Sequence, residues 1–155
     1  MMLPPARDAK TCIMTTESKT ISGSCYCGAV RFEAALPSKF CAHCHCRNCR
    51  RSHGAAFVTW VGFKDEQVRV VSGEEKLGRF KTETDATRRF CTTCGTTLFF
   101  SSPRWGGETH IALANVDDPI DREPAAHVYF DRHVPWLTLD DDLKRFGGRS
   151  GTEPL

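Results

Sequence analysis

Seven of the nine cysteines in the chain fall into three short groups. The groups are Cys25 and Cys27 in CYC, Cys44, Cys46 and Cys49 in CHCRNC, and Cys91 and Cys94 in CTTC. Thiolate sulfur is a preferred ligand of zinc in proteins; four protein ligands close a structural site, whereas a catalytic site has three and keeps one position open. Seven grouped cysteines therefore predict two zinc ions per chain, one structural and one catalytic.

The two outer groups are the candidates for the structural site. Cys91 and Cys94 follow a β-type run and precede Gly95, which permits the tight turn of a zinc-ribbon half. Cys25 and Cys27 are likewise followed by a glycine and a β-type run. We expect these four cysteines to hold one zinc. Single cysteines on strands can also be small buried hydrophobes, and a CxxC pair can be a redox centre.

The middle group, called the triad below, consists of Cys44, Cys46 and Cys49 and lies within six residues. A single loop can therefore direct all three sulfurs at one ion, and we expect the triad to form the catalytic site. The alternative is a second closed site with a fourth ligand. The candidate fourth ligands are His43, His45, His53 and Cys41. Cys12 and Cys41 are otherwise expected to take no part.

The composition limits the kinds of protein that could carry these groups. A length of 155 residues suits one domain, and 40% hydrophobic with 26% charged residues is a globular balance. The formal net charge of +2 is too small to favour nucleic acid or an anionic membrane as a partner. No apolar run approaches the roughly 20 residues that cross a bilayer. The first residues lack the apolar core of a secretory signal, which predicts a cytoplasmic protein with reduced thiols.

Short β-type runs must position the cysteines. The run AVRFEA, residues 29–34, alternates apolar and charged residues as a half-buried strand does. The other candidate strands are residues 55–61, 67–71, 77–82, 87–91, 96–100, 109–114 and 127–130. Because no segment keeps a 3.6-residue apolar period over three turns, we expect helix only at residues 47–52 and 139–146. The sequence thus predicts an all-β fold with minor helix.

Changes in composition along the chain set the expected domain boundaries. Residues 1–19 are polar and without periodicity, which predicts a disordered leader, and Met14 could be the native start. Residues 20–146 are expected to form a single zinc domain. Residues 147–155, GGRSGTEPL, predict a flexible tail.

Five stretches together resemble the glutathione-dependent formaldehyde-activating enzyme (GFA) family. They are GSCYCGAVRFEA, CHCRNCRRSHGAAFVTWV, RRFCTTCGTTLFF, IALANVDDP and PWLTLDD. The resemblance implies a β-tent fold, a structural zinc on the outer cysteines and a catalytic zinc on the triad. It also implies the condensation of formaldehyde with glutathione, formally a carbon–sulfur lyase step in reverse. Relatives such as centromere protein V are described as binding proteins, so a zinc-stabilised interaction module without catalysis is the alternative function.

The triad suits a thiol better than water. Zinc held by three thiolates has a formal charge of −1, which makes it a poor Lewis acid. An external thiol such as glutathione fits a sulfur-rich site as the fourth ligand, and the ion lowers the pKa of that thiol. We expect the zinc-bound thiolate to attack formaldehyde or a related small aldehyde.

Basic side chains follow the triad closely in the sequence. Arg47, Arg50 and Arg51 could offset its negative charge and bind the carboxylates of glutathione, or they could simply solvate a loop. His53 or His45 could carry the proton between the thiol and the new hydroxyl, because histidine titrates near neutrality. The catalytic set expected from the sequence is therefore the triad with His53, and the three arginines are expected to bind the cosubstrate.

Overall fold

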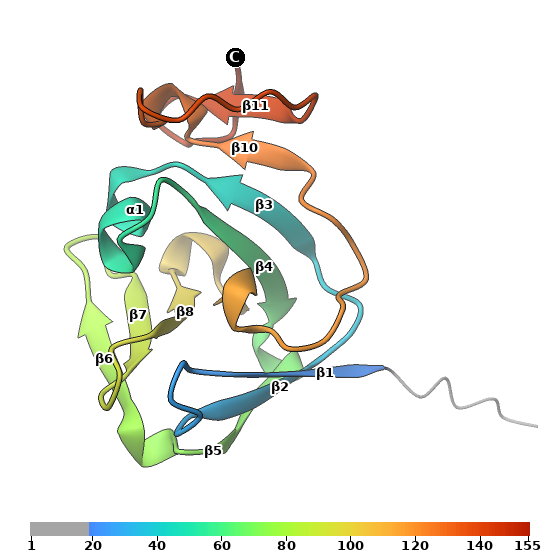
Figure 1. Cartoon of the computed structure of the whole chain (residues 1–155), viewed down its shortest axis with the longest axis vertical. Helices are drawn as coiled ribbons and strands as arrows, with labels where there is room; N and C mark the ends of the chain where they lie inside the picture. The colour runs from blue at the N-terminus through green and yellow to red at the C-terminus, as the bar shows by residue number, and fades with distance from the viewer. Residues whose placement is uncertain (1–18) are drawn as a thin grey trace, which may run out of the picture.

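The computed structural model describes residues 19–155, which form two β-sheets with one α-helix and several short 3₁₀ turns (Figure 1). The smaller sheet has the strand order β1-β2-β5, and the larger has the order β12-β11-β10-β3-β4-β9-β8-β7-β6. The prediction of an all-β fold with minor helix is confirmed. The predicted leader, with Cys12 and Met14, lies outside the described residues except for Lys19. Within them, no helix is long and apolar enough to cross a membrane.

The predicted strands appear in the structure with small changes at their ends. The small sheet consists of β1 (Thr20–Ser24), β2 (Arg31–Ala35) and β5 (Val68–Ser72). The large sheet consists of β3 (Phe40–Cys44), β4 (Val58–Lys64), β6 (Leu77–Lys81), β7 (Thr87–Cys91), β8 (Thr97–Ser101), β9 (Glu108–Ala112), β10 (Ala126–Val128), β11 (Lys144–Gly147) and β12 (Glu153–Pro154). The helix α1 spans Arg47–His53. The 3₁₀ turns are η1 (Asp65–Gln67), η2 (Glu74–Lys76), η3 (Pro103–Trp105), η4 (Leu113–Asn115) and η5 (Phe130–Arg132).

The main core joins the two sheets. Phe32 of β2 and Phe99 of β8 are fully buried, and their rings meet edge to face with centroids 5.1 Å apart. Ile21 of β1, Phe63 of β4 and Ile111 of β9 are buried in the same cluster. Burying one such side chain contributes about 1.5–3 kcal/mol. This apolar cluster holds the small sheet, and the cysteines at the end of β1, against the large one.

Strand β3 brings the triad into the large sheet, and the sequence did not predict it. It pairs antiparallel with β4 and parallel with β10, where His127 is the partner of His43. The strand lacks a recognisable alternation of apolar and polar residues, because cysteine and histidine fill alternate positions in FCAHC. Gly62 of β4 allows the Phe40 ring to pack closely, since a Cβ at this glycine would lie 2.1 Å from Phe40 Cε1. Cys44 is the last residue of the strand, so the triad begins where the sheet ends.

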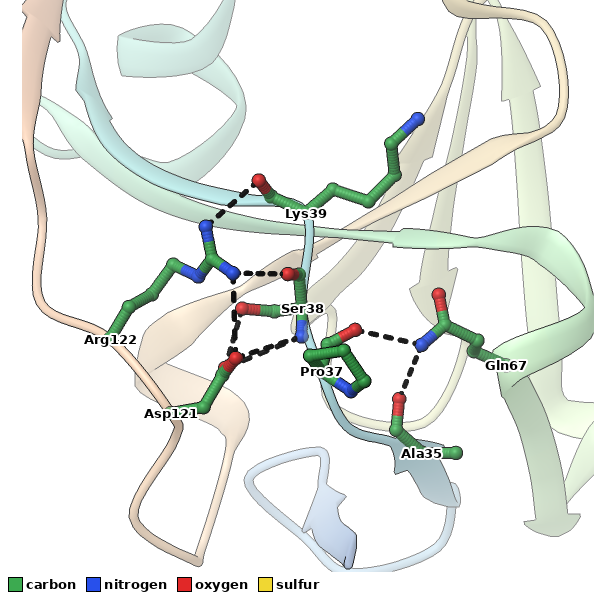
Figure 2. Close-up of polar contacts among 7 residues, drawn as sticks. All are labelled: Ala35, Pro37, Ser38, Lys39, Gln67, Asp121 and Arg122. Atoms are coloured by element: carbon green, nitrogen blue, oxygen red, sulfur yellow. Dashed lines mark hydrogen bonds and ion pairs between the residues drawn. The ribbon is translucent and has the colours of Figure 1, made fainter. Parts of the chain in front are cut away.

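A polar clamp fixes the chain that enters β3 (Figure 2). The Asp121 carboxylate accepts hydrogen bonds from the hydroxyl of Ser38, at 2.6 Å, and from its backbone N–H. The Arg122 guanidinium donates to the backbone carbonyl oxygens of Ser38 and Lys39. On the other side, Gln67 donates its amide protons to carbonyl oxygens of the same connecting segment. These bonds tie three distant parts of the chain together just before β3.

The C-terminal part differs from the sequence expectation at two places. The helix predicted for residues 139–146 is wrong: residues 144–147 form β11, parallel to β10. Asp141 accepts the backbone N–H of Leu143 at 3.1 Å, a local bond that competes with helical pairing. Within residues 147–155, the predicted tail, Glu153 and Pro154 form β12, antiparallel to β11. Glu153 accepts hydrogen bonds from the backbone N–H and hydroxyl of Ser150, which closes the turn between these strands.

Candidate metal centres and active site

The outer cysteines meet in one cluster, called the tetrad below. It consists of Cys25, Cys27, Cys91 and Cys94, whose sulfurs all lie within 4.8 Å of one another. The Cys25–Cys27 and Cys27–Cys91 sulfur distances are 3.6 and 3.9 Å. A tetrahedral zinc with Zn–S bonds of about 2.3 Å needs sulfurs about 3.8 Å apart. The spacing and the four-sulfur donor set therefore fit zinc.

The two halves of the tetrad have the same local design. In one half the backbone N–H of Gly95 donates to the carbonyl oxygen of Cys91 at 2.8 Å, and Gly95 takes a φ of 78°. In the other half Gly28 donates to Cys25 at 2.9 Å with a φ of 73°. A positive φ is readily accessible only to glycine. The glycine after each cysteine pair therefore has the turn role that the sequence predicted.

The three middle cysteines form the second cluster. Cys44 ends β3, Cys46 caps the N-terminus of α1, and Cys49 lies in its first turn. Their sulfurs also lie within 4.8 Å of one another. Cys46 Sγ accepts the backbone N–H of Cys49 at 3.2 Å, so this sulfur also serves as the helix cap. No histidine, aspartate, glutamate or further cysteine of residues 19–155 joins the three.

The residues considered as a fourth ligand make other contacts. His43 Nδ1 hydrogen-bonds to the Thr59 hydroxyl at 2.8 Å, and His45 Nε2 to His127 Nδ1 at 2.8 Å. Cys41 is buried elsewhere on β3, where burial raises the pKa of its thiol to about 11. His53 lies at the end of α1 with its ring edge against Trp60, at a centroid distance of 5.2 Å. The structure thus shows a set of three sulfurs, which suits a metal that also takes an external ligand.

The cation that hydrogen-bonds to a triad sulfur is not one of the predicted arginines. Arg47 and Arg51 are exposed on α1, and Arg50 donates from Nε to the carbonyl oxygen of His45 at 3.0 Å. Arg88 of β7, which sequence reasoning missed, is 7% exposed and places Nη2 at 3.5 Å from Cys49 Sγ. These contacts assign the charge-compensating position to Arg88.

Two further contacts hold Arg88 in place. Its Nη1 donates to the Ser52 hydroxyl at 2.9 Å, and its guanidinium lies 5.1 Å from the Phe100 ring centroid. The sequence TRRFC would place Arg89, not Arg88, on the face of Cys91 if the strand alternated strictly. Arg88 and Cys91 thus alternate to opposite faces of β7, which pairs with β6 in unbroken register. Both are buried because both faces are covered: Cys91 lies in the main core, and Arg88 lies against Cys49 and Ser52 of α1. Nothing in the sequence indicated that α1 would cover the second face.

Cys49 is the triad thiol most easily ionised. Hydrogen bonds from Cys44 and Cys46, together with the Arg88 guanidinium, hold the pKa of Cys49 well below its usual range. The same sulfur–sulfur contacts raise the pKa of Cys44. A cluster with one favoured thiolate and a buried cation beside it is arranged to hold negative sulfur.

A cavity of about 710 Å³ lies between the tetrad turn and the last turn of α1. Cys94 and Gly95 of the tetrad turn line it on one side, and Ser52 and His53 of α1 line it on the other. The triad sulfurs do not line this cavity, and it approaches them through the last turn of α1. Its remaining lining is neutral: Tyr26, Ala55, Phe57, Val58, Thr59, Thr96, Thr97, Ala112, Leu113, Ala114 and Asn115.

His53 is the titratable side chain best placed between this cavity and the triad. Its Nε2 atom is buried without a hydrogen-bond partner among the described residues. Burial lowers the pKa of His53, and the nearby Arg88 lowers it further, against an opposing effect of Cys49. The ring is therefore neutral at physiological pH and can accept a proton.

Comparisons with known proteins agree with this geometry. A family model described as glutathione-dependent formaldehyde-activating enzyme matches residues 20–132. A Halomonas elongata protein, whose name assigns it provisionally to the glutathione-dependent formaldehyde-activating enzymes, is 28% identical over 127 residues, covering 77% of this chain and 81% of that protein. An uncharacterized lyase of Schizosaccharomyces pombe is 34% identical over 79 residues, covering 51% of this chain and 56% of the lyase. A crystal structure of a Rhodobacter sphaeroides protein superposes with a TM-score of 0.56 at 30% identity, covering 66% of this chain and 93% of that one.

Proposed function

Because the chain belongs to the glutathione-dependent formaldehyde-activating enzyme family, we propose that it is a zinc-dependent carbon–sulfur lyase that condenses a thiol with a small aldehyde. Glutathione is the proposed thiol and formaldehyde the proposed aldehyde, in the cytoplasm, where glutathione keeps thiols reduced. The product would be S-hydroxymethylglutathione. The Schizosaccharomyces pombe relative, which is named a lyase, supports the reaction class.

The observation that carries the proposal is the difference between the two clusters. Four sulfurs make up the tetrad, which suits a closed structural zinc, whereas the triad contains three from residues 19–155. A binding module stabilised by two structural metals would be expected to use four protein ligands at both sites. The triad therefore fits the enzyme better than the alternative of an interaction module without catalysis.

A different contact holds each of the three triad sulfurs in place. Zinc bound here would supply a position for the external thiol and would lower the pKa of that thiol. Cys44 is fixed by the last pair of the β3–β4 ladder, and Cys46 by its capping bond to Cys49. Arg88 donates to Cys49 and offsets the charge of the sulfurs. These contacts pre-organise the three thiolates before any ligand arrives.

The proposed reaction needs one proton carrier and no oxidant. The carbon–sulfur bond forms as the thiol sulfur attacks the carbonyl carbon, the carbon–oxygen π bond breaks, and the oxygen takes a proton. His53 would accept the thiol proton at Nε2 and return it to the oxygen, consistent with its neutral, buried ring beside the cavity. Arg47 and Arg51 are exposed and available for the glutathione carboxylates, whereas Arg50 is bonded to His45.

The direct test measures exchange rather than product, because thiols and formaldehyde also combine without a catalyst. Exchange NMR with ¹³C-formaldehyde and glutathione gives the rate at which label passes between free aldehyde and adduct. We expect the zinc-loaded protein to raise this rate, and Cys46→Ser to remove the increase. Serine is also a good helix cap, so this variant loses a sulfur while α1 is kept.

Two controls define the result. S-methylglutathione, which lacks a thiol but keeps the amino group that also adds formaldehyde, should show no increase in exchange with either protein. Elemental analysis should find two zinc ions in the wild type and one in Cys46→Ser. An exchange rate equal to that of buffer, measured on wild-type protein with both zinc ions present, would reject the proposed activity.

A further inference from the structure

His45, the residue between Cys44 and Cys46, is fixed at three points. Its backbone N–H donates to the carbonyl oxygen of Val128 at 3.0 Å, and its own carbonyl oxygen accepts from Arg50 at 3.0 Å. The third point is the ring, whose Nε2 lies 2.8 Å from His127 Nδ1. The position of His45 therefore sets the direction of the chain between two triad sulfurs.

Hydrogen bonds lead from the His45 ring through His127 to the protein surface. His127 of β10 places Nε2 at 3.0 and 3.1 Å from the two carboxylate oxygens of Asp141. His45 and His127 are each 1% exposed, whereas the Asp141 side chain is 36% exposed. Three side chains from separate segments thus form one hydrogen-bonded chain, which starts at solvent and ends beside the triad.

The carboxylate determines the direction of every bond in this chain. An ionised Asp141 only accepts, so His127 must carry its proton on Nε2. When His127 carries only this proton, its Nδ1 accepts and His45 donates from Nε2. This leaves His45 Nδ1 unprotonated, in agreement with its lack of a hydrogen-bond partner among the described residues. A second proton there would bury both a charge and an unpaired donor, which is costly.

Apolar rings enclose the buried part of the chain. Phe57 and Phe130 lie with centroids 5.2 and 5.1 Å from the His45 ring, and Phe130 also lies 5.2 Å from His127. Hydrogen bonds in such an environment are stronger than in water, and water competes for them poorly. The two imidazoles are therefore held in one orientation.

We propose that Asp141 is a positioning residue for the triad, acting through His127 and His45 to fix the segment that carries Cys44 and Cys46. The inference deepens the proposed function and rests on the triad being a metal site. Partners behind metal ligands orient those ligands and commonly contribute 10–100-fold to affinity. Here the partner lies nearly 100 positions from Cys44 in the sequence and acts on the backbone between two ligands.

The test compares zinc release from Asp141→Ala and from a matched control, Asp142→Ala. The control removes an equal charge one residue away, from an exposed side chain. Zinc transfer to a chromophoric chelator should show separate triad and tetrad phases, and Cys46→Ser identifies the triad phase by lacking it. We expect Asp141→Ala to accelerate the triad phase on the order of 10-fold, with the tetrad phase unchanged.

Spectroscopy and a conservative variant separate positioning from general stability. Cobalt placed in the triad should show shifted ligand-field bands in Asp141→Ala but not in Asp142→Ala. Asp141→Glu should restore much of the slow release. Equal release from the Asp141 and Asp142 variants, or acceleration of both zinc phases together with a lower melting temperature, would overturn the positioning role and leave the enzyme proposal standing. A wild-type triad that retains no zinc would overturn both.

Discussion

At the scale of single residues, the triad depends on a cation that comes from another strand. Arg88 is buried and donates to both Cys49 Sγ and the Ser52 hydroxyl. A hydrogen bond to a charged group contributes about 1.5–3 kcal/mol. Removing the Arg88 guanidinium takes this contribution away from the buried triad sulfurs. We predict that Arg88→Met weakens zinc binding at the triad by roughly 10-fold or more, measured by competition with a chelator. Arg89→Met is the matched control, because Arg89 contacts Thr109 and Phe99 instead. Equal affinities in the two variants would contradict the role given to Arg88.

The second prediction at this scale concerns His53 and pH. Burial lowers the pKa of His53 below its ordinary value of about 6.5, so the neutral base persists as pH falls through that value. We predict that protonation of His53 does not slow exchange above about pH 6.5. The exchange rate should fall only when the pH drops through the lowered pKa that His53 has in the folded protein. His53→Gln should have a lower rate and should lack this acidic limb. Zinc content must be measured at each pH. If His53→Gln keeps the same fall in exchange rate at acidic pH while its zinc content is constant, His53 is excluded as the proton carrier.

At the scale of elements, the Asp121 clamp holds the entry to β3 and therefore the start of the triad. Burial alone would raise the pKa of Asp121, but hydrogen bonds from Ser38 and the charge of Arg122 hold this pKa below its usual value. We predict that Asp121→Ala lowers the free energy of unfolding by about 1–3 kcal/mol at neutral pH, since it leaves Ser38 unsatisfied. Urea unfolding of zinc-loaded protein measures the change. Asp117→Ala, at an exposed position of the same segment, should unfold like the wild type.

The elements also show what the sequence could and could not predict. Strands such as β6 and β7 were recovered because their signals are local: β-type runs between turn residues. The helix α1 was predicted over residues 47–52 and ends one residue later, at His53. Strand β3 was missed because its cysteines and histidine obscure the alternation of apolar and polar residues that identifies a strand. The error at residues 139–146 has a local and a tertiary cause, since Asp141 accepts the backbone N–H of Leu143 and also bonds to His127, which lies 14 positions earlier. Arg88 and Asp141 both act across strands, so spacing along the chain gave no sign of either.

At the scale of the whole molecule, the two clusters differ in how much chain they connect. The tetrad joins Cys27 to Cys91, which lie 64 positions apart, and so links the small sheet to β7 of the large one. The triad spans six residues, Cys44 to Cys49. By the expression used for disulfide loops, closing a loop of the first size restrains the unfolded chain by about 4 kcal/mol, against about 2 kcal/mol for the second. A metal in the tetrad should therefore stabilise the fold more than a metal in the triad.

This difference predicts opposite outcomes for two conservative substitutions. Cys91→Ser should lower the melting temperature strongly or prevent folding, because it opens the long loop and leaves three thiolates without their full metal site. Cys46→Ser should change the melting temperature by only a few degrees, since the serine keeps the cap of α1, while exchange activity is lost. Differential scanning calorimetry, with zinc counted on the same samples, measures both.

The reverse ranking, a stable Cys91→Ser and an unfolded Cys46→Ser, would mean that the triad is the structural site and the tetrad the reactive one. Of the two clusters, the tetrad is the one whose residues line the 710 Å³ cavity, through Cys94 and Gly95, so that reversal would place the chemistry at the end of the cavity opposite His53.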